Sequence, residues 1–324
     1  MIRSVLLWAA FAAMPYGCPI ALAAPAQQPA QQPAKPGSFD HIRILVHDIA
    51  AARIAYRDGL GFAFPDPEPY VYDEGSAHDG TDLPDDFYLE LIGIANREKL
   101  VQVRPWIVSF LDSTEGAHSI GLLVPSAAET AKRLQSQGIE APIFKLARAN
   151  PQDPPVLLVT PKMPHLPEGA IFFLEYPPKR ASTKPEAPPA PQPNTVKAIV
   201  AIWIVVNDLD RSSEDLRTLG FSPGGSFRYA KLGAQAREFR SGRSRIVLLQ
   251  ANAGGLAAHF ASTRGQGLLG MTLEVADLQK ATALVEEHTQ RCFPTYRGRY
   301  GRSFFIPPEL AAGAWIEMVQ KSRK

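Results

Sequence analysis

Four stretches of the chain repeat one pattern of apolar and polar positions. In each stretch an apolar run predicts a buried strand, an acidic or hydroxyl side chain follows, and a segment with helical spacing comes next. Aspartate and serine are favoured N-cap residues, so each of these side chains marks the start of a predicted helix. The four predicted N-caps are Asp48, Ser126, Asp208 and Asp277.

A helix stop and a further apolar run complete each unit. The first three predicted helices end at glycines (Gly59 and Gly61, Gly138, and Gly220), whereas the fourth unit has Arg291-Cys292-Phe293 at this point. Further strands are predicted at 87–94, 170–176, 245–250 and 314–319. The N-caps are 78, 82 and 69 residues apart, from 48 to 126, 208 and 277. This spacing predicts four copies of a strand–helix–strands unit that pair into two domains.

The N-terminus and two proline-rich stretches divide the chain. Arg3, the apolar run 5–14 and Ala21-Leu22-Ala23 are typical of a secretory signal peptide at 1–23, which predicts a periplasmic or secreted protein. No apolar stretch is long enough for a membrane span. Proline-rich composition predicts a tether at 24–37 and a linker at 182–195. The two domains are therefore predicted at 38–181 and 196–322.

Charge differs between the two halves of the chain. Residues 1–195 hold 16 Lys and Arg against 21 Asp and Glu (−5), and residues 196–324 hold 18 against 11 (+7), giving the total of +2. Neither half has the concentrated positive charge of a nucleic-acid-binding domain. Cys292 is the single cysteine left once the signal is removed, so no disulfide within the chain is expected.

Short motifs in the first half resemble the vicinal-oxygen-chelate superfamily, which includes glyoxalase I, extradiol dioxygenases and bleomycin-resistance proteins. The resemblance rests on 40–42, Val46 with Asp48, Tyr56, 60–62 and 88–91. The segments 80–81, 104–106, 110–111 and 115–116 are similar to the glyoxalase-like domain subfamily. The resemblance covers 38–178 well and 196–320 more weakly. It implies an α+β fold of two tandem domains, each built from paired βαβββ modules whose curled mixed sheets surround a cavity.

The resemblance also implies a metal site in the first domain. Metal-binding members place one ligand near the start of the first strand of a module and another on its last strand. The matching residues here are His41, Glu90, His118 and Glu175. Two imidazoles and two carboxylates suit one divalent ion of zinc, nickel, iron or manganese.

The second domain does not repeat this set. Its matching positions are Ala201, Leu269 and the acid-free run 246–249, and Glu317 alone matches a ligand, Glu175. We therefore expect no metal site of this kind in the second domain.

Three features leave undecided whether the first domain binds a metal and which residues hold it. Arg43 can neutralise Glu90 without a metal. His41 lies seven residues before its N-cap and His118 lies eight before its own, and a one-residue slip turns a strand side chain to the opposite face. His78, in a Gly- and Asp-rich segment, is interpreted as a loop residue near the mouth of the cavity.

The leading function from the sequence is a secreted glyoxalase-like metalloprotein acting on a small oxygen-chelating substrate. By resemblance to glyoxalase I, the chemistry is of lyase or isomerase type through a metal-stabilised enediolate, with Glu175 as the catalytic base. One alternative is a metal-free protein that binds or sequesters a small molecule, as bleomycin-resistance members do. A further alternative is an extradiol-type dioxygenase using His41, His118 and Glu175 as iron ligands. We expect a monomer or small homo-oligomer with a small-molecule substrate and no nucleic-acid partner.

Overall fold

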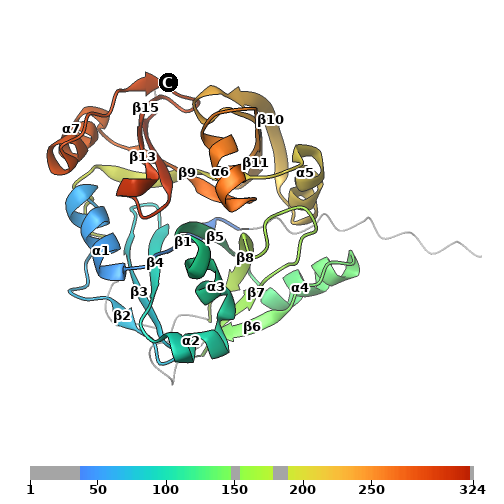
Figure 1. The fold of residues 1–324 in the computed structure, drawn as a ribbon. Coiled ribbons are helices and arrows are strands. Elements are labelled where there is room, and N and C mark those ends of the chain that lie inside the picture. Colours follow the sequence, from blue (N-terminus) through green and yellow to red (C-terminus); the bar gives the residue numbers. More distant parts are fainter. Residues whose placement is uncertain (1–36, 147–153, 178–188, 322–324) are drawn as a thin grey trace, which may run out of the picture. The chain divides into compact units, whose positions relative to one another are not determined.

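Each half of the chain folds into one mixed sheet of eight strands (Figure 1). The computed structural model describes residues 37–146, 154–177 and 189–321. The first sheet contains β1 (Phe39–Leu45), β2 (Tyr70–Val71), β3 (Ser76–Asp82), β4 (Tyr88–Ile94), β5 (Gly116–Leu123), β6 (Ile143–Leu146), β7 (Val156–Val159) and β8 (Ile171–Glu175). Their order across the sheet is β2-β3-β4-β1-β5-β8-β7-β6.

The second sheet has the same plan. It contains β9 (Val196–Val205), β10 (Ser222–Tyr229), β11 (Ala234–Ser241), β12 (Ser244–Ala251), β13 (Gly267–Val275), β14 (Tyr296–Arg297), β15 (Arg302–Ile306) and β16 (Trp315–Gln320). Their order is β10-β11-β12-β9-β13-β16-β15-β14, which is the order of the first sheet with every strand replaced by its counterpart.

Helices connect the strands and follow the predicted caps. The first half has α1 (Ile49–Ile54) running into a π-helical turn (Ala55–Gly59), α2 (Arg97–Val103), α3 (Pro105–Ser113) and α4 (Ala127–Ser136). The second half has α5 (Leu209–Thr218), α6 (Leu256–Arg264), α7 (Leu278–Thr289) and short 3₁₀ turns at Ala230–Leu232 and Pro308–Leu310. All four predicted N-caps are confirmed, because each side chain accepts a hydrogen bond from a backbone N–H of the first helical turn. The fourth unit, which lacks the glycine stop, ends α7 at Gln290 in the left-handed region (φ 55°).

The predicted fold class is confirmed by the pairing within each sheet. The central strands β1 and β5 are antiparallel, and each pairs in parallel with the last long strand of its own module, β4 or β8. The second sheet repeats this with β9, β13, β12 and β16. Each sheet is therefore two βαβββ modules side by side, and the chain is two tandem curled domains of α+β type. Of the predicted boundaries, the signal peptide, residues 24–36 of the tether and residues 182–188 of the linker lie outside the described residues.

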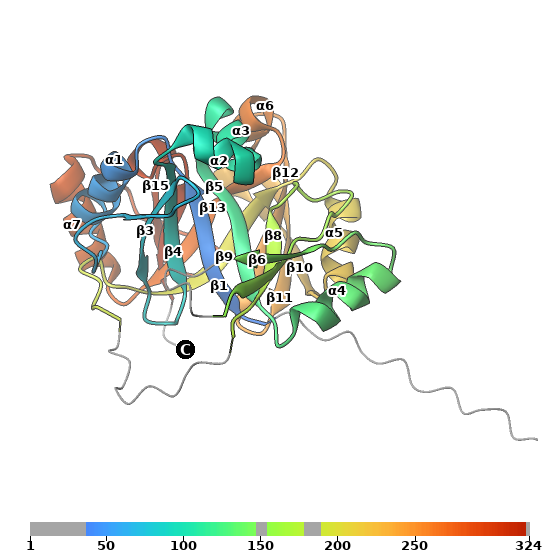
Figure 2. The same ribbon diagram turned by 90° about the horizontal axis from the view of Figure 1, so that it is seen from below.

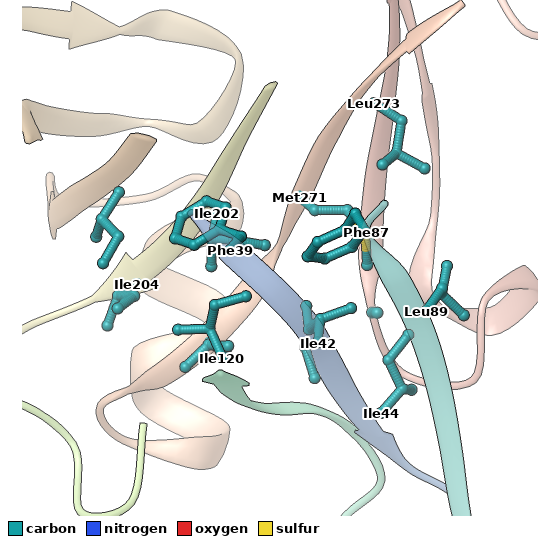
Figure 3. Packing of buried hydrophobic residues seen from close by; sticks show 14 of the residues in the cluster. Phe39, Ile42, Ile44, Phe87, Leu89, Ile120, Ile202, Ile204, Met271 and Leu273 are labelled. Atoms are coloured by element: carbon teal, nitrogen blue, oxygen red, sulfur yellow. The ribbon is translucent and has the colours of Figure 1, made fainter. Parts of the chain in front are cut away.

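The two sheets share one hydrophobic core. Residues 34–324 form one compact body, and a single buried cluster takes Ile42, Ile44 and Leu89 from the first sheet and Ile202 and Met271 from the second. Figure 3 shows these side chains of β1 and β4 meeting those of β9 and β13. We call the sheet faces that contribute to this cluster the core faces.

The opposite face of the first sheet is called the site face below. It carries the alternate residues of each strand, and α2 and α3 pack against part of it through the buried cluster of Leu45, Ile92 and Leu100. In Figure 2, α2 and α3 lie beside one another along one edge of the sheet. Among the described residues, we find no helix with the length and apolar composition needed to cross a bilayer.

Candidate functional site

Three charged or titratable side chains lie together on the site face of the first sheet. His41 and Arg43 project from β1, and Glu90 projects from β4. Arg43 and Glu90 are register partners, so their side chains are neighbours on one face. His41 and Arg43 are buried, with 6% and 8% of their surfaces exposed. Of the four predicted metal ligands, the structure thus brings His41 and Glu90 together.

The carboxylate of Glu90 is surrounded by cationic or imidazole groups. Its Oε1 is 2.8 Å from His78 Nδ1, and its Oε2 is 3.6 Å from His41 Nε2 and 3.5 Å from Arg43 Nε. Burial alone raises the pKa of a carboxyl group, but His78, His41 when protonated, and Arg43 together outweigh it and hold the pKa of Glu90 well below its usual value. An ionised carboxylate of this kind suits the binding of cations better than the uptake of a proton.

Asp40 fixes the orientation of the His41 ring. His41 Nδ1 is 2.6 Å from Asp40 Oδ2, which also accepts a hydrogen bond from the Tyr176 hydroxyl at 3.0 Å. An ionised carboxylate only accepts hydrogen bonds, so His41 carries a proton on Nδ1, and in the neutral ring the lone pair is on Nε2. This Nε2 is buried and has no hydrogen-bond partner within the described residues. Metal-ligating histidines and general bases share this arrangement.

His78 holds Glu90 from the neighbouring strand and was not predicted as a site residue. His78 Nε2 is 2.9 Å from Ser76 Oγ, which donates to Glu74 Oε1 at 2.9 Å. Arg104 NH2 lies 3.2 Å from the same oxygen of Glu74. The interpretation of His78 as a loop residue was wrong, because it lies within β3. The segment has no apolar alternation that marks it as a strand, which is why sequence reasoning missed it.

Phe172 occupies the position on β8 that faces this cluster. The guanidinium carbon of Arg43 lies 3.9 Å from the centre of the Phe172 ring. In the ladder between β5 and β8, Phe172 pairs with Gly121, and in the corresponding ladder of the second sheet Glu317 pairs with Thr272. The residue of the first domain that corresponds to Glu317 is therefore Phe172, a different correspondence from the one that the sequence suggested.

Glu175 lies on the other face of the sheet. It follows Ile171 and Phe173 in the alternation of β8, and both of these belong to the shared core. Its Oε2 accepts a hydrogen bond from Ala127 N at 2.7 Å, at the start of α4. The structure therefore does not bring Glu175 to Glu90, whose side chain projects from the site face.

His118 lies at an irregularity in β5. The pairing of β5 with β1 shifts at this point, as the pairing of β13 with β9 shifts at Leu269. The His118 ring stacks on Trp106 at 4.7 Å between centroids and meets Phe110 edge-on at 4.9 Å. Burial, with smaller effects from Arg43 and Arg264, lowers the pKa of His118 to about 3, so its ring is neutral at pH 7. Its Nδ1 is buried without a partner among the described residues.

Comparison with known families settles the relationship of this chain. A family model described as the glyoxalase-like domain matches residues 39–220, more than half of the chain. The chain belongs to the glyoxalase-like domain family. It is thereby a member of the vicinal-oxygen-chelate superfamily, as the sequence motifs predicted. No curated protein gives a significant match.

Solved structures support the same fold over nearly the whole chain. A mutant of 4-hydroxymandelate synthase from Streptomyces coelicolor superposes with a TM-score of 0.62 at 12% identity, covering 90% of this chain and 95% of that one. A hypothetical protein from Staphylococcus aureus gives a TM-score of 0.57 at 11% identity, covering 87% and 98%. At these identities the likeness shows the fold alone.

Glyoxalase-like and related domains commonly bind a divalent metal, but the four predicted ligands do not fit one ion in this structure. His41 and Glu90 are neighbours, His118 packs among aromatic rings, and Glu175 projects from the core face. Within residues 37–146, 154–177 and 189–321, no three His, Cys, Asp or Glu side chains are arranged to hold a metal. We therefore derive no step of the chemistry through a metal.

The second domain fills the corresponding region with its own side chains. Glu317 is fully buried and accepts hydrogen bonds from the Tyr229 hydroxyl at 2.7 Å, from Thr272 Oγ1 at 2.9 Å and from the Tyr296 hydroxyl. Burial and the neighbouring Glu317 charge raise the pKa of both tyrosines above the usual range, so they remain hydroxyl donors. With three hydroxyl donors on one carboxylate, this cluster is satisfied internally.

Proposed function

We propose that the first domain is an enzyme site that binds a small molecule with neighbouring oxygen atoms and transfers a proton on it, with His41 as the base. One observation carries the proposal: among the described residues the buried Nε2 of His41 has no hydrogen-bond partner, whereas Asp40 holds Nδ1. A buried nitrogen lone pair without a partner is costly, so it favours a site that a ligand completes. Membership of the glyoxalase-like family supports a small-molecule ligand.

Arg43 supplies the complementary charge next to this base. It projects from the same face of β1 two residues after His41, and its Nε has no hydrogen-bond partner within the described residues. The ring of Phe172 covers one side of the guanidinium and keeps water from it. A cation in such surroundings stabilises negative charge that forms on a nearby oxygen.

These groups support proton transfer at a carbon next to a carbonyl. His41 Nε2 takes a proton from that carbon, and the electron pair moves to the carbonyl oxygen beside Arg43. Glu90, 3.6 Å from Nε2, stabilises the imidazolium that forms. Return of the proton to the former carbonyl carbon, with transfer of the neighbouring hydroxyl proton to the former carbonyl oxygen, isomerises the substrate. Expulsion of a leaving group from the carbon next to the enediolate, with the electron pair of its bond, makes the reaction a lyase step.

Two of the other functions considered from the sequence use Glu175, which lies on the core face. The role of base that the resemblance gave to Glu175 passes to His41, because Glu175 is bonded to the start of α4. An extradiol dioxygenase would require Glu175 beside His41 and His118 on one iron, but Glu175 projects from the core face. A metal-free binding protein would use the same site face without proton transfer, and the experiment below separates it from an enzyme.

Solvent exchange tests the proposal directly. The protein is incubated in D₂O with two α-hydroxycarbonyl probes, dihydroxyacetone and hydroxypyruvate, and exchange of the protons next to the carbonyl is followed by NMR. We expect the wild type to accelerate exchange and His41→Gln to reduce the rate by about 100-fold or more. Glu175→Gln is the matched control and should exchange like the wild type.

Three results contradict the proposal. Equal exchange in wild type and His41→Gln excludes His41 as the base, and loss of exchange in Glu175→Gln returns that role to Glu175. If saturation-transfer NMR detects binding of a probe without any exchange, the site is that of a binding protein rather than an enzyme.

Export is a separate proposal that rests on residues 1–23 alone. Expression of the full chain in a Gram-negative host, followed by cell fractionation and N-terminal sequencing, tests it. We expect a periplasmic product that begins after Ala23, and a cytoplasmic product that keeps Met1 would contradict it.

A further inference from the structure

A cavity that does not include the His41 site lies where the two halves of the chain meet. It has a volume of about 540 Å³, within the range of small-molecule pockets. One wall comes from α3, the start of β5 and the loop before β8, and the other comes from α6 and the start of β13. Figure 2 shows α3 and α6 along the same edge of the molecule.

The cavity contains an arginine, Arg264, that makes no ion pair within the part of the chain that the structure describes. The guanidinium carbon of Arg264 is 4.8 Å from the centre of the Phe260 ring and 5.4 Å from that of Phe110, and both phenylalanines line the cavity. NH1 of Arg264 donates to the carbonyl of Gly313 at 3.2 Å. Among the described residues no carboxylate lies within ion-pair distance of Arg264. A partly buried cation of this kind is stabilised when a ligand brings a carboxylate to it.

Nearby acids do not neutralise Arg264. Glu115 acts on it electrostatically, but the Glu115 carboxylate accepts from His47 N at 3.1 Å and lies 3.2 Å from His47 Nδ1. Glu168 also lines the cavity and makes no ion pair with Arg264. Burial is the main cause that lowers the pKa of Arg264 to about 10, which leaves it charged at neutral pH.

His118 provides a second unpartnered polar group on the opposite wall. It lines the cavity, and its Nδ1 is buried with no hydrogen-bond partner in the described residues. Leu166, Pro167 and Leu268 add apolar groups to the two walls, which also carry the hydroxyls of Ser113, Thr114 and Thr263. Within the described residues, the cavity therefore combines a guanidinium that makes no ion pair, a neutral imidazole, two phenylalanine rings and a lining of mixed polarity.

We propose that this cavity binds a small organic carboxylate with a flat apolar body. The carboxylate pairs with Arg264, and the body lies against the Phe110, Phe260 and His118 rings that line the cavity. A guanidinium binds a carboxylate through two parallel N–H···O bonds, so the anion is preferred over a neutral molecule of the same shape. This binding does not involve His41 or Glu90 and is independent of the proposed function.

Binding of 2-naphthoate and its neutral isostere 2-naphthamide to the full chain tests the proposal. Saturation-transfer NMR and titration give the Kd of each probe. We expect naphthoate to bind the wild type at least tenfold more tightly than naphthamide, and Arg264→Gln to remove that preference. Arg291→Gln removes an exposed arginine of the same half that pairs with Glu309, and it should leave both Kd values unchanged.

Three outcomes overturn the proposal. The first is equal affinity of the wild type for naphthoate and naphthamide, a comparison that does not depend on how well any variant folds. The second is a naphthoate Kd in folded Arg264→Gln that equals the wild-type value. The third is the absence of naphthoate binding at about 10 mM. His41→Gln should bind naphthoate normally, so failure of the His41 site leaves this result unaffected.

Discussion

Phe172 in the first sheet and Glu317 in the second occupy the same register position, each on the strand that pairs in parallel with the first strand of its module. Glu90 on β4 and Val247 on β12 occupy the corresponding positions in the other two modules. The first domain thus has one carboxylate and one aromatic ring at these positions, and the second has one carboxylate and one aliphatic chain. The carboxylate therefore stands on the first module in the first domain and on the second module in the second domain.

The first prediction concerns metal binding. Phe172→Glu supplies a second carboxylate on the site face that carries His41 and Glu90, so we expect zinc to bind the variant about tenfold more tightly than the wild type. Arg43 competes for the new carboxylate, which keeps the gain modest. Phe172→Gln, without the charge, is the control in a calorimetric titration. If the wild type already holds one tightly bound ion that Glu175→Gln loses, the ligand set predicted from the sequence stands.

The second prediction concerns the buried carboxylate of the second domain. Glu317→Gln leaves three hydroxyl donors around a group that is itself partly a donor, so we expect the free energy of unfolding to fall by about 2–4 kcal/mol. Tyr229→Phe removes one donor and should cost about 1 kcal/mol. Urea denaturation measures both values. A neutral effect of Glu317→Gln would mean that water already satisfies this cluster.

The third prediction is a pH dependence that belongs to His118. The pKa of His118 is about 3 in the folded chain and about 6.5 in the unfolded chain, so between these values the unfolded chain binds a proton that the folded chain does not. Stability therefore falls as the pH decreases from 7 toward 3, by at most about 2 kcal/mol at pH 5.

The variant His118→Leu isolates this contribution, since Leu269 occupies the equivalent irregular position of the second sheet. The difference in unfolding free energy between pH 7 and pH 5 should be smaller in the variant than in the wild type, as measured by urea denaturation at both values. Glu90 does not interfere, because its lowered pKa places its contribution below pH 5. Identical pH profiles for the two proteins would contradict the buried neutral state of His118.

The fourth prediction concerns the pair of Asp40 and His41. Asp40→Asn removes the charge that holds the proton on Nδ1, so we expect proton exchange on the probe compounds to slow by about 10- to 100-fold. Nitrogen-15 NMR of His41 should show a mixture of tautomers in place of one. Tyr176→Phe removes only the second hydrogen bond to Asp40 and should keep the single tautomer. An unchanged His41 spectrum in Asp40→Asn would show that other groups set the tautomer.

The repeat of capped helices made the fold predictable from the sequence. Asp48, Ser126, Asp208 and Asp277 each stabilise a helix start through a local hydrogen bond, and local interactions of this kind are visible in a short stretch of sequence. The spacing between them was enough to predict four modules in two domains. His41 and Glu90 were also predicted together, because the resemblance to metal-binding members of the superfamily places one ligand on each of these two strands.

The faces on which the remaining site residues lie could not be predicted, because the alternation of apolar and polar positions does not show them. In β8 the neighbours Phe172 and Phe173 are both apolar, so the sequence does not reveal which one faces the core, and Glu175 was assigned to the wrong neighbours as a result. His118 lies at a shift in strand register, and nothing in its flanking residues marks the shift. Asp40 contributes to the site through its hydrogen bond with His41. This bond can be recognised only when the positions of both side chains are known.

The shared core also limits how this protein can be shortened in the laboratory or in evolution. The family match ends at residue 220, after β9 but before β12 and β13, the two strands that flank β9 in the second sheet. A fragment that stops there leaves both edges of a long apolar strand open, which invites aggregation. The second half is therefore part of the folding unit of the first, and we expect a chain truncated at this boundary to aggregate.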